Sequence, residues 1–138
     1  MLHKVQDLMD KPQYLGSSIY HVLLFLTDGN IHDLRETIDA MVNASNYPIS
    51  IIIVGIGDGD FSSMEFLDGD DKELMRDGGN IEAKRDICQF VKFNDFRDED
   101  GTNADLLAEA VLEEVPDQLV GFMTETNEKP GDRNKSKN

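Results

Sequence analysis

A continuous apolar run that stops at a polar turn constrains the fold of this chain more than any other feature. The run covers residues 22–26 and is followed directly by Thr27, Asp28 and Gly29. An unbroken run of branched and aromatic side chains is typical of a strand covered on both faces, as in a parallel sheet flanked by helices. The Asp28 carboxylate is then predicted at the carboxyl edge of that sheet, where α/β folds bind ligands.

Three further segments complete the predicted fold. Apolar residues at helical spacing predict a helix over residues 34–45, with Asp33 and Glu36 in the form of a capping box. Residues 49–57 predict a second buried strand, so that strand, helix and strand form a right-handed βαβ unit. Residues 88–93 predict a shorter third strand near a sheet edge. The predicted class is α/β, a parallel sheet of about three strands flanked by helices.

Shorter patterns predict the remaining helices. Residues 2–9 favour an amphipathic helix, and residues 61–67 favour one or two helical turns. A last helix is expected to begin near Thr102 or Asn103, either of which can cap it. Pro116 falls inside its apolar pattern, so a kink or restart is expected there.

Charge and cysteine usage exclude several functions. The net charge is −15, and such acidity repels nucleic-acid phosphates and anionic membranes. Residues 124–138 are polar and basic, and we expect a disordered tail there after a domain covering residues 1–123. The single cysteine, Cys88, excludes a disulfide within the chain and a cysteine zinc cluster, and a buried thiol is expected. With neither a signal peptide nor a membrane span predicted, a cytoplasmic setting is expected.

Asp28 is the leading candidate for chemistry. A carboxylate at a strand end, followed by glycine, can help to hold a hard cation or position a water, but it can equally bond to local backbone amides. Magnesium requires octahedral geometry from several directions, so one aspartate does not make a site. Residues 55–59 depart from the dinucleotide motif, and Asp58 and Asp60 would repel a pyrophosphate. The acidic run 58–71 also fails the calcium-loop pattern, which favours a solvated acidic surface.

These segments together resemble the later half of a copine-type von Willebrand factor A domain. The similarity lies in residues 20–29, 49–57 and 66–71, and continues through residues 85–91 and 115–120. Several separate motifs in the right order make the resemblance specific, and it covers about residues 1–123.

The resemblance implies a metal-ion-dependent adhesion site built from three loops. The family's first loop, D-x-S-x-S, has no match in this chain, and its threonine loop would precede Met1. Only the third-loop aspartate carries over, to Asp28, with Thr27 and Gly29 beside it. Binding of Mg²⁺ or Mn²⁺ is therefore expected to be weak or absent. The paired calcium-dependent lipid-binding domains of copines have no counterpart here, so phospholipid and plasma-membrane binding with calcium is expected only of a full-length parent.

The resulting hypothesis is a non-enzymatic module that binds proteins through loops around Thr27, Asp28 and Gly29, residues 58–60 and residues 95–101. It is expected to be a fragment, a short isoform or a truncated product of a copine-like protein. In the family's sheet the Asp28 strand lies beside the missing first strand, so its open edge favours self-association. One alternative is a small acidic enzyme or phosphoacceptor that uses Asp28. Another is the copine-like domain of a plant RING ubiquitin ligase, without its cysteine-rich RING.

Overall fold

A three-stranded parallel sheet forms the centre of the molecule. The computed structural model describes residues 19–68, 75–76 and 81–126. Within them the sheet has the order β1 (His21–Thr27), β2 (Ile49–Gly55), β5 (Cys88–Lys92). Leu24 of β1 is level with Ile52 of β2, which is in turn level with Gln89 of β5. The predicted α/β class and the parallel three-stranded sheet are confirmed.

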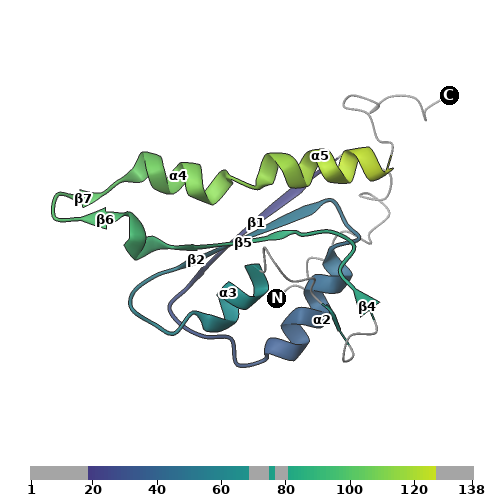
Figure 1. Cartoon of the computed structure of the whole chain (residues 1–138), viewed down its shortest axis with the longest axis horizontal. Coiled ribbons are helices and arrows are strands. Elements are labelled where there is room, and N and C mark those ends of the chain that lie inside the picture. The colour runs from purple at the N-terminus through teal and green to yellow at the C-terminus, as the bar shows by residue number, and fades with distance from the viewer. Residues whose placement is uncertain (1–18, 69–74, 77–80, 127–138) are drawn as a thin grey trace.

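Helices cover the sheet from two sides. Figure 1 shows α2 (Leu34–Ala44) and α3 (Ser62–Asp68) on one face, and α4 (Ala104–Leu112) with α5 (Val115–Thr126) on the other. The main apolar core lies between the sheet and the α2–α3 layer. Its buried members are Met41, Ala44, Ile49, Ile51, Ile53, Phe61, Met64, Leu67, Ile87 and Cys88.

The prediction that the first strand is covered on both faces is wrong for β1. Its burial alternates along the strand, and Val22, Leu24 and Leu26 are 51%, 54% and 66% exposed. Leu23 and Phe25 point the other way and pack against the core. The physical reason is position: β1 is an edge strand, and α5 packs over β2, so the outer part of that face stays open among the described residues.

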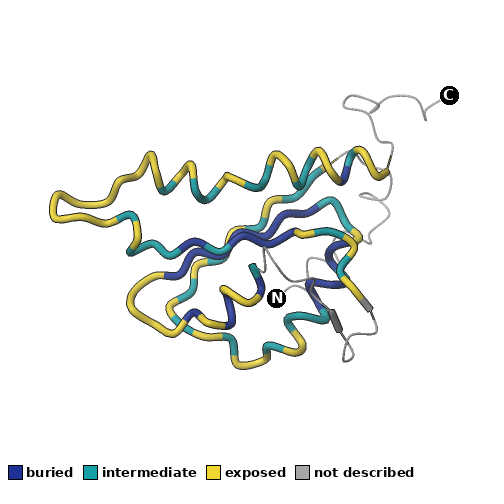
Figure 2. The backbone as a smooth tube through the Cα atoms, in the orientation of Figure 1, coloured by how far each residue is buried: buried dark blue, intermediate teal, exposed yellow. Residues whose placement is uncertain are grey.

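The central strand matches its prediction, and the third strand does so in part. Every residue of β2 is buried, whereas β5 is shorter and only partly buried, as expected of a strand at the sheet edge. Figure 2 shows this gradient, with dark blue along β2 and much of β5 and yellow on the loops that follow the strands.

Helix ends follow the predicted positions, but their caps differ. Asn103 precedes α4, and its side chain accepts a hydrogen bond from the Leu106 amide at 3.2 Å. Asp33 precedes α2 but makes no capping hydrogen bond through its side chain, so the predicted capping box is wrong. Its backbone, at φ −112° and ψ 56°, accepts the Thr37 amide through the carbonyl oxygen instead. Pro116 is the second residue of α5, which confirms the predicted restart.

Two short antiparallel pairs complete the described structure. β3 (Met75–Arg76) pairs with β4 (Ile81–Glu82), and β6 (Arg97–Asp98) pairs with β7 (Gly101–Thr102). The helix expected at residues 2–9 lies outside the described residues. Residues 127–138 of the expected tail lie outside them as well. Residues 124–126 form the last turn of α5.

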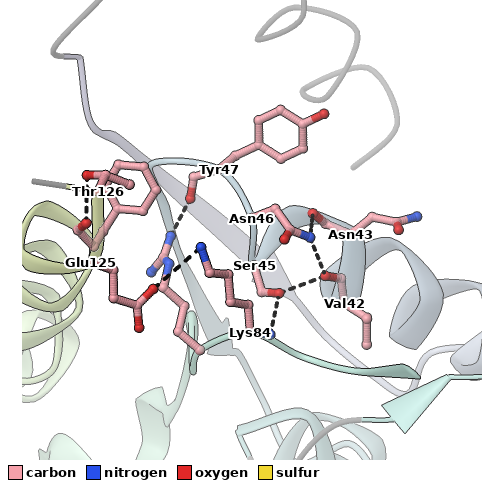
Figure 3. A network of polar contacts seen from close by, with 10 residues as sticks. Val42, Asn43, Ser45, Asn46, Tyr47, Lys84, Glu125 and Thr126 are labelled. Atoms are coloured by element: carbon pink, nitrogen blue, oxygen red, sulfur yellow. Dashed lines mark hydrogen bonds and ion pairs between the residues drawn. The ribbon is translucent and has the colours of Figure 1, made fainter. Parts of the chain in front are cut away.

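Polar contacts tie the end of α2 to the segment before β5 and to α5, as Figure 3 shows. The buried Ser45 hydroxyl donates to the Val42 carbonyl at 2.7 Å and accepts the Lys84 amide at 2.9 Å. The Lys84 ammonium lies 3.7 Å from the carboxylate of Glu125 on α5. The Arg85 guanidinium donates to backbone carbonyls at the start of β2 and lies over the Phe122 ring. These bonds hold α5 against the amino end of the sheet.

Cys88 is fully buried at the start of β5, as predicted. Burial raises the pKa of its thiol well above the usual value, and the negative charges of Asp68, Asp86 and Glu114 raise it further. The thiol is therefore neutral in the folded protein, which is the state expected of a structural cysteine rather than a reactive one.

Candidate functional site

Three loops meet at the carboxyl edge of the sheet. The loop after β1 contains Asp28 and Asn30, the loop after β2 contains Asp58 and Asp60, and Asn94 follows β5. In a parallel sheet all strand ends of one kind lie at the same edge, which is why these side chains come together. The edge is acidic and exposed: Asp28, Asp58 and Asp60 all face solvent.

The loop after β1 and the loop after β2 are in close backbone contact. The Ile56 amide donates to the Thr27 carbonyl at 2.7 Å and continues the β1–β2 ladder into the loops. Further along, a Cβ added at Gly59 would overlap the Asp28 carbonyl oxygen and come within 3.2 Å of Gly29 Cα. Glycine at position 59 thus allows the two loops to touch.

Side-chain amides bridge the loops at two points. Asn30 Nδ2 donates to the Asp60 carboxylate at 3.2 Å. Asn94 Nδ2 donates to the Asp58 carboxylate at 2.8 Å and to the Gly57 carbonyl at 3.0 Å. Each amide joins a different pair of loops, so the edge forms one connected surface.

Local hydrogen bonds also hold two of the predicted site residues, Asp60 and Asp28, in place. The backbone amide of Ser62 donates to Asp60 at 3.0 Å. That bond, and then the Ser62 hydroxyl, lower the pKa of Asp60, so its carboxylate stays charged. The Thr27 hydroxyl donates to the Gly29 carbonyl at 3.1 Å and so closes the turn that carries Asp28.

The donor set of this edge does not fit a complete divalent-cation site. Across the residues that the structure describes, no three histidine, cysteine or acidic side chains gather closely enough to hold a metal. Carboxylate oxygens of Asp58 and Asp60 accept the bonds described above. Asp28 is exposed at the turn after β1, and one carboxylate by itself provides too few ligands for octahedral Mg²⁺.

Sequence reasoning found the acidic residues of this edge but missed Asn30, Asn94 and Ser63. Ser63 of α3 accepts the Ile31 amide at 3.1 Å and anchors the end of the first loop. The strand-end rule that singled out Asp28 also applies to Asn94, because Asn94 follows the third predicted strand directly. No comparable signal pointed to Ser63.

A groove of about 810 Å³ lies away from Asp28, along β5 and the α4–α5 layer. Its lining mixes Arg85 and Lys92 with several carboxylates, among them Asp86, Glu113 and Asp117. Lys92 forms an ion pair with Glu65 of α3.

Within the described part of the chain, no helix is both long enough and apolar enough to cross a bilayer.

Comparison with known proteins gives a consistent relationship. The family model described as Copine matches residues 1–131. Copine-D of Dictyostelium discoideum is 47% identical over 104 residues, which are 75% of this chain and 19% of that protein. Copine-B of the same organism is 46% identical over 115 residues, or 83% of this chain and 21% of that protein.

A plant protein shows similar identity. Protein BONZAI 1 of Arabidopsis thaliana is 44% identical over 115 residues, which are 83% of this chain and 19% of that protein. The matched region thus spans about a fifth of the length of the curated relatives.

Proposed function

Since the chain belongs to the copine family, we propose that it is a non-enzymatic module that binds proteins through the loops at the carboxyl edge of its sheet. The observation that carries this proposal is the bridging of three loops by Asn30 and Asn94. A surface held by such bonds keeps its shape before binding, so less conformational entropy is lost when a partner docks. Its exposed aspartates favour a partner with a basic surface.

The proposal is tested by binding to an array of basic and neutral peptides. Asp58→Asn and Asp60→Asn remove charge from the loops, whereas Asp105→Asn removes the same charge from the exposed first turn of α4. We expect basic peptides to lose at least about tenfold in affinity with the loop variants and to keep it with the control. Equal binding by all three variants would refute a loop-based surface, and so would a preference for neutral peptides.

We further propose that Mg²⁺ or Mn²⁺ interacts with this chain weakly, through Asp28. The support is that no group of three histidine, cysteine or acidic side chains able to hold a metal ion occurs among the described residues. Calorimetric titration of the chain with MgCl₂ or MnCl₂ is expected to give millimolar or absent binding. Tight binding that Asp28→Ala abolishes would show that other residues complete the site.

The main alternative is a phosphoacceptor that uses Asp28. That chemistry requires a lysine and an acidic pair around the reacting carboxylate, but Lys92 pairs with Glu65 instead. Incubation with acetyl phosphate is expected to leave Asp28 unlabelled. Hydroxylamine-sensitive phosphate on Asp28, absent from Asp28→Asn, would restore the alternative. The ubiquitin-ligase alternative assigns no ligase activity to these residues, because a RING needs several cysteines and the chain has one.

We propose a cytoplasmic setting and no direct membrane contact for these 138 residues. A net charge of −15 and a buried, unpaired cysteine support this. Phospholipid binding with calcium remains a proposal for a longer copine. Sedimentation with phosphatidylserine vesicles, with and without calcium, is expected to leave the chain in the supernatant.

A further inference from the structure

The two edges of the sheet differ in how their backbone groups are used. At the outer edge of β5, the Cys88 amide donates to the Asp86 carboxylate at 3.0 Å, and the Phe90 amide donates to the Asp68 carboxylate at 2.6 Å. These carboxylates occupy donors that an added strand would need. The β5 edge is therefore protected against strand addition.

The outer edge of β1 has no such protection among the described residues. The His21 amide and the Thr27 carbonyl point toward β2, where they bond to Pro48 and Ile56. Because backbone groups alternate in direction along a strand, those of Val22, Leu24 and Leu26 point outward. The same three residues have half-exposed or more exposed apolar side chains.

We propose that the β1 edge pairs with the β1 edge of a second copy of this chain, antiparallel about a two-fold axis at Leu24. This register sets Leu24 opposite Leu24 of the second copy, and Val22 opposite Leu26. Antiparallel strands exchange two hydrogen bonds at alternate residue pairs. Such pairs form only where residues whose backbone groups point outward lie opposite one another. The Leu24-centred register achieves this for Val22, Leu24 and Leu26.

The charge distribution favours a second copy of this strand as the occupant. His21–Thr27 contains no carboxylate, lysine, arginine or proline. In the Leu24-centred register Asp28 lies opposite Tyr20 of the second copy, so no carboxylate faces another across the strands. The acidic residues still repel one another at long range, and salt screens this repulsion. Association should therefore strengthen with ionic strength, the opposite of what a salt-bridged interface would do.

The size of the contact sets the strength of the association. Seven residues at about 3.3 Å per residue give a strip about 23 Å long. One strand edge buries far less than the roughly 800 Å² per partner of a standard stable interface. We therefore expect a weak dimer, with a dissociation constant in the micromolar to millimolar range.

Sedimentation velocity of the 138-residue chain tests the proposal over a range of protein and NaCl concentrations. The weight-average mass is expected to rise from 15.5 kDa toward twice that value, and to rise further at high salt. Leu24→Lys sets two ammonium groups against each other at the two-fold axis and should abolish dimerisation. Val120→Lys is the matched control, because Val120 is also apolar and is 61% exposed, but lies on α5. It should dimerise like the wild type.

Cysteine cross-linking tests the register directly, even if Leu24→Lys fails to fold. Opposed residues in an antiparallel pair have Cα atoms about 5.5 Å apart, which a disulfide can span. With copper phenanthroline as oxidant, Leu24→Cys should therefore give a covalent dimer. Val22→Cys alone should not, because two Val22 residues would lie about 13 Å apart along the strands.

Three results would overturn the proposal. The first is a chain that stays monomeric at about 1 mM in high salt. The second is dimerisation that Leu24→Lys leaves intact or that Val120→Lys removes equally. The third is a cross-link through Val22→Cys that matches or exceeds the one through Leu24→Cys.

Discussion

Gly59 is the residue at which the two acidic loops touch. Its backbone lies against the Asp28 carbonyl, so even a methyl group has no space there. Gly29 lies close to Gly59 in the facing loop, yet nothing lies within 4 Å of a Cβ added at position 29. The two glycines thus differ in what a side chain would meet, although both are near the candidate site.

Gly59→Ala is expected to lower the free energy of unfolding by about 1–3 kcal/mol, because the overlap forces the loops apart. Gly29→Ala is the matched control and should change it by less than about 0.5 kcal/mol. Urea denaturation followed by circular dichroism measures both variants. Equal effects of the two substitutions would show that the loop contact is not rigid.

Cys88 links stability to pH at the alkaline end. Its folded-state pKa is raised by burial, so the unfolded chain releases the thiol proton first. Stability from this group is complete below about pH 8.5, where an exposed thiol is protonated, and it declines as the pH rises above that value. Urea unfolding at pH 8 and pH 10 should show a larger loss for the wild type than for Cys88→Ala. Parallel losses would mean that the thiol ionises equally in both states.

At the scale of single elements, the two helix starts offer a natural comparison. Asn103 caps α4 through its side chain, whereas Asp33 precedes α2 without a capping bond from its carboxylate. Both residue types are strong N-cap formers, so sequence alone predicted a cap at each. The distinction depends on the backbone angles at the helix start, which tertiary contacts determine.

Asn103→Ala is expected to cost about 1 kcal/mol of unfolding free energy, through the lost bond to the Leu106 amide. Asp33→Ala should cost less than half as much, because only a favourable charge near the helix start is lost. Thermal and urea unfolding of the two variants checks the order. An equal or larger loss for Asp33→Ala would contradict the cap assignment.

The strands show what periodicity can and cannot predict. The unbroken apolar runs of β1 and β2 look alike in sequence, but β2 is buried throughout and β1 on one side only. The hydrophobic pattern of a strand indicates how much of it can be buried. The position of the strand in the sheet determines how much of it is buried.

At the scale of the whole molecule, α/β class and strand direction could be predicted because short connections and right-handed crossovers leave few arrangements. The Asp28 edge followed from the same rule. The amide bridges could not be predicted, because they depend on side-chain contacts between Asn30 and Asp60, and between Asn94 and Asp58. These contacts join residues thirty and thirty-six positions apart.

Net charge is also a property of the whole molecule, and at −15 it opposes the compact state by self-repulsion. Raising NaCl from about 20 to 500 mM shortens the screening length from roughly 20 Å to about 4 Å, so the urea midpoint should rise. The measurement is made at a protein concentration well below the dimer dissociation constant found by sedimentation, so that the chain is monomeric. KCl should act like NaCl, because screening depends on ionic strength. An unchanged or falling midpoint would show that self-repulsion does not limit stability.

The inequality of the two sheet edges has a consequence for growth. An edge that accepts a strand would normally let molecules add end to end into fibrils, since each addition exposes a fresh edge. Here the far edge of every copy is closed by Asp86 and Asp68. A β1-to-β1 contact occupies the open edge of both molecules. The β5 edge of each molecule then cannot accept a further strand. The carboxylates of Asp86 and Asp68, which accept the outward amides of β5, thus limit a potential polymer to a finite pair.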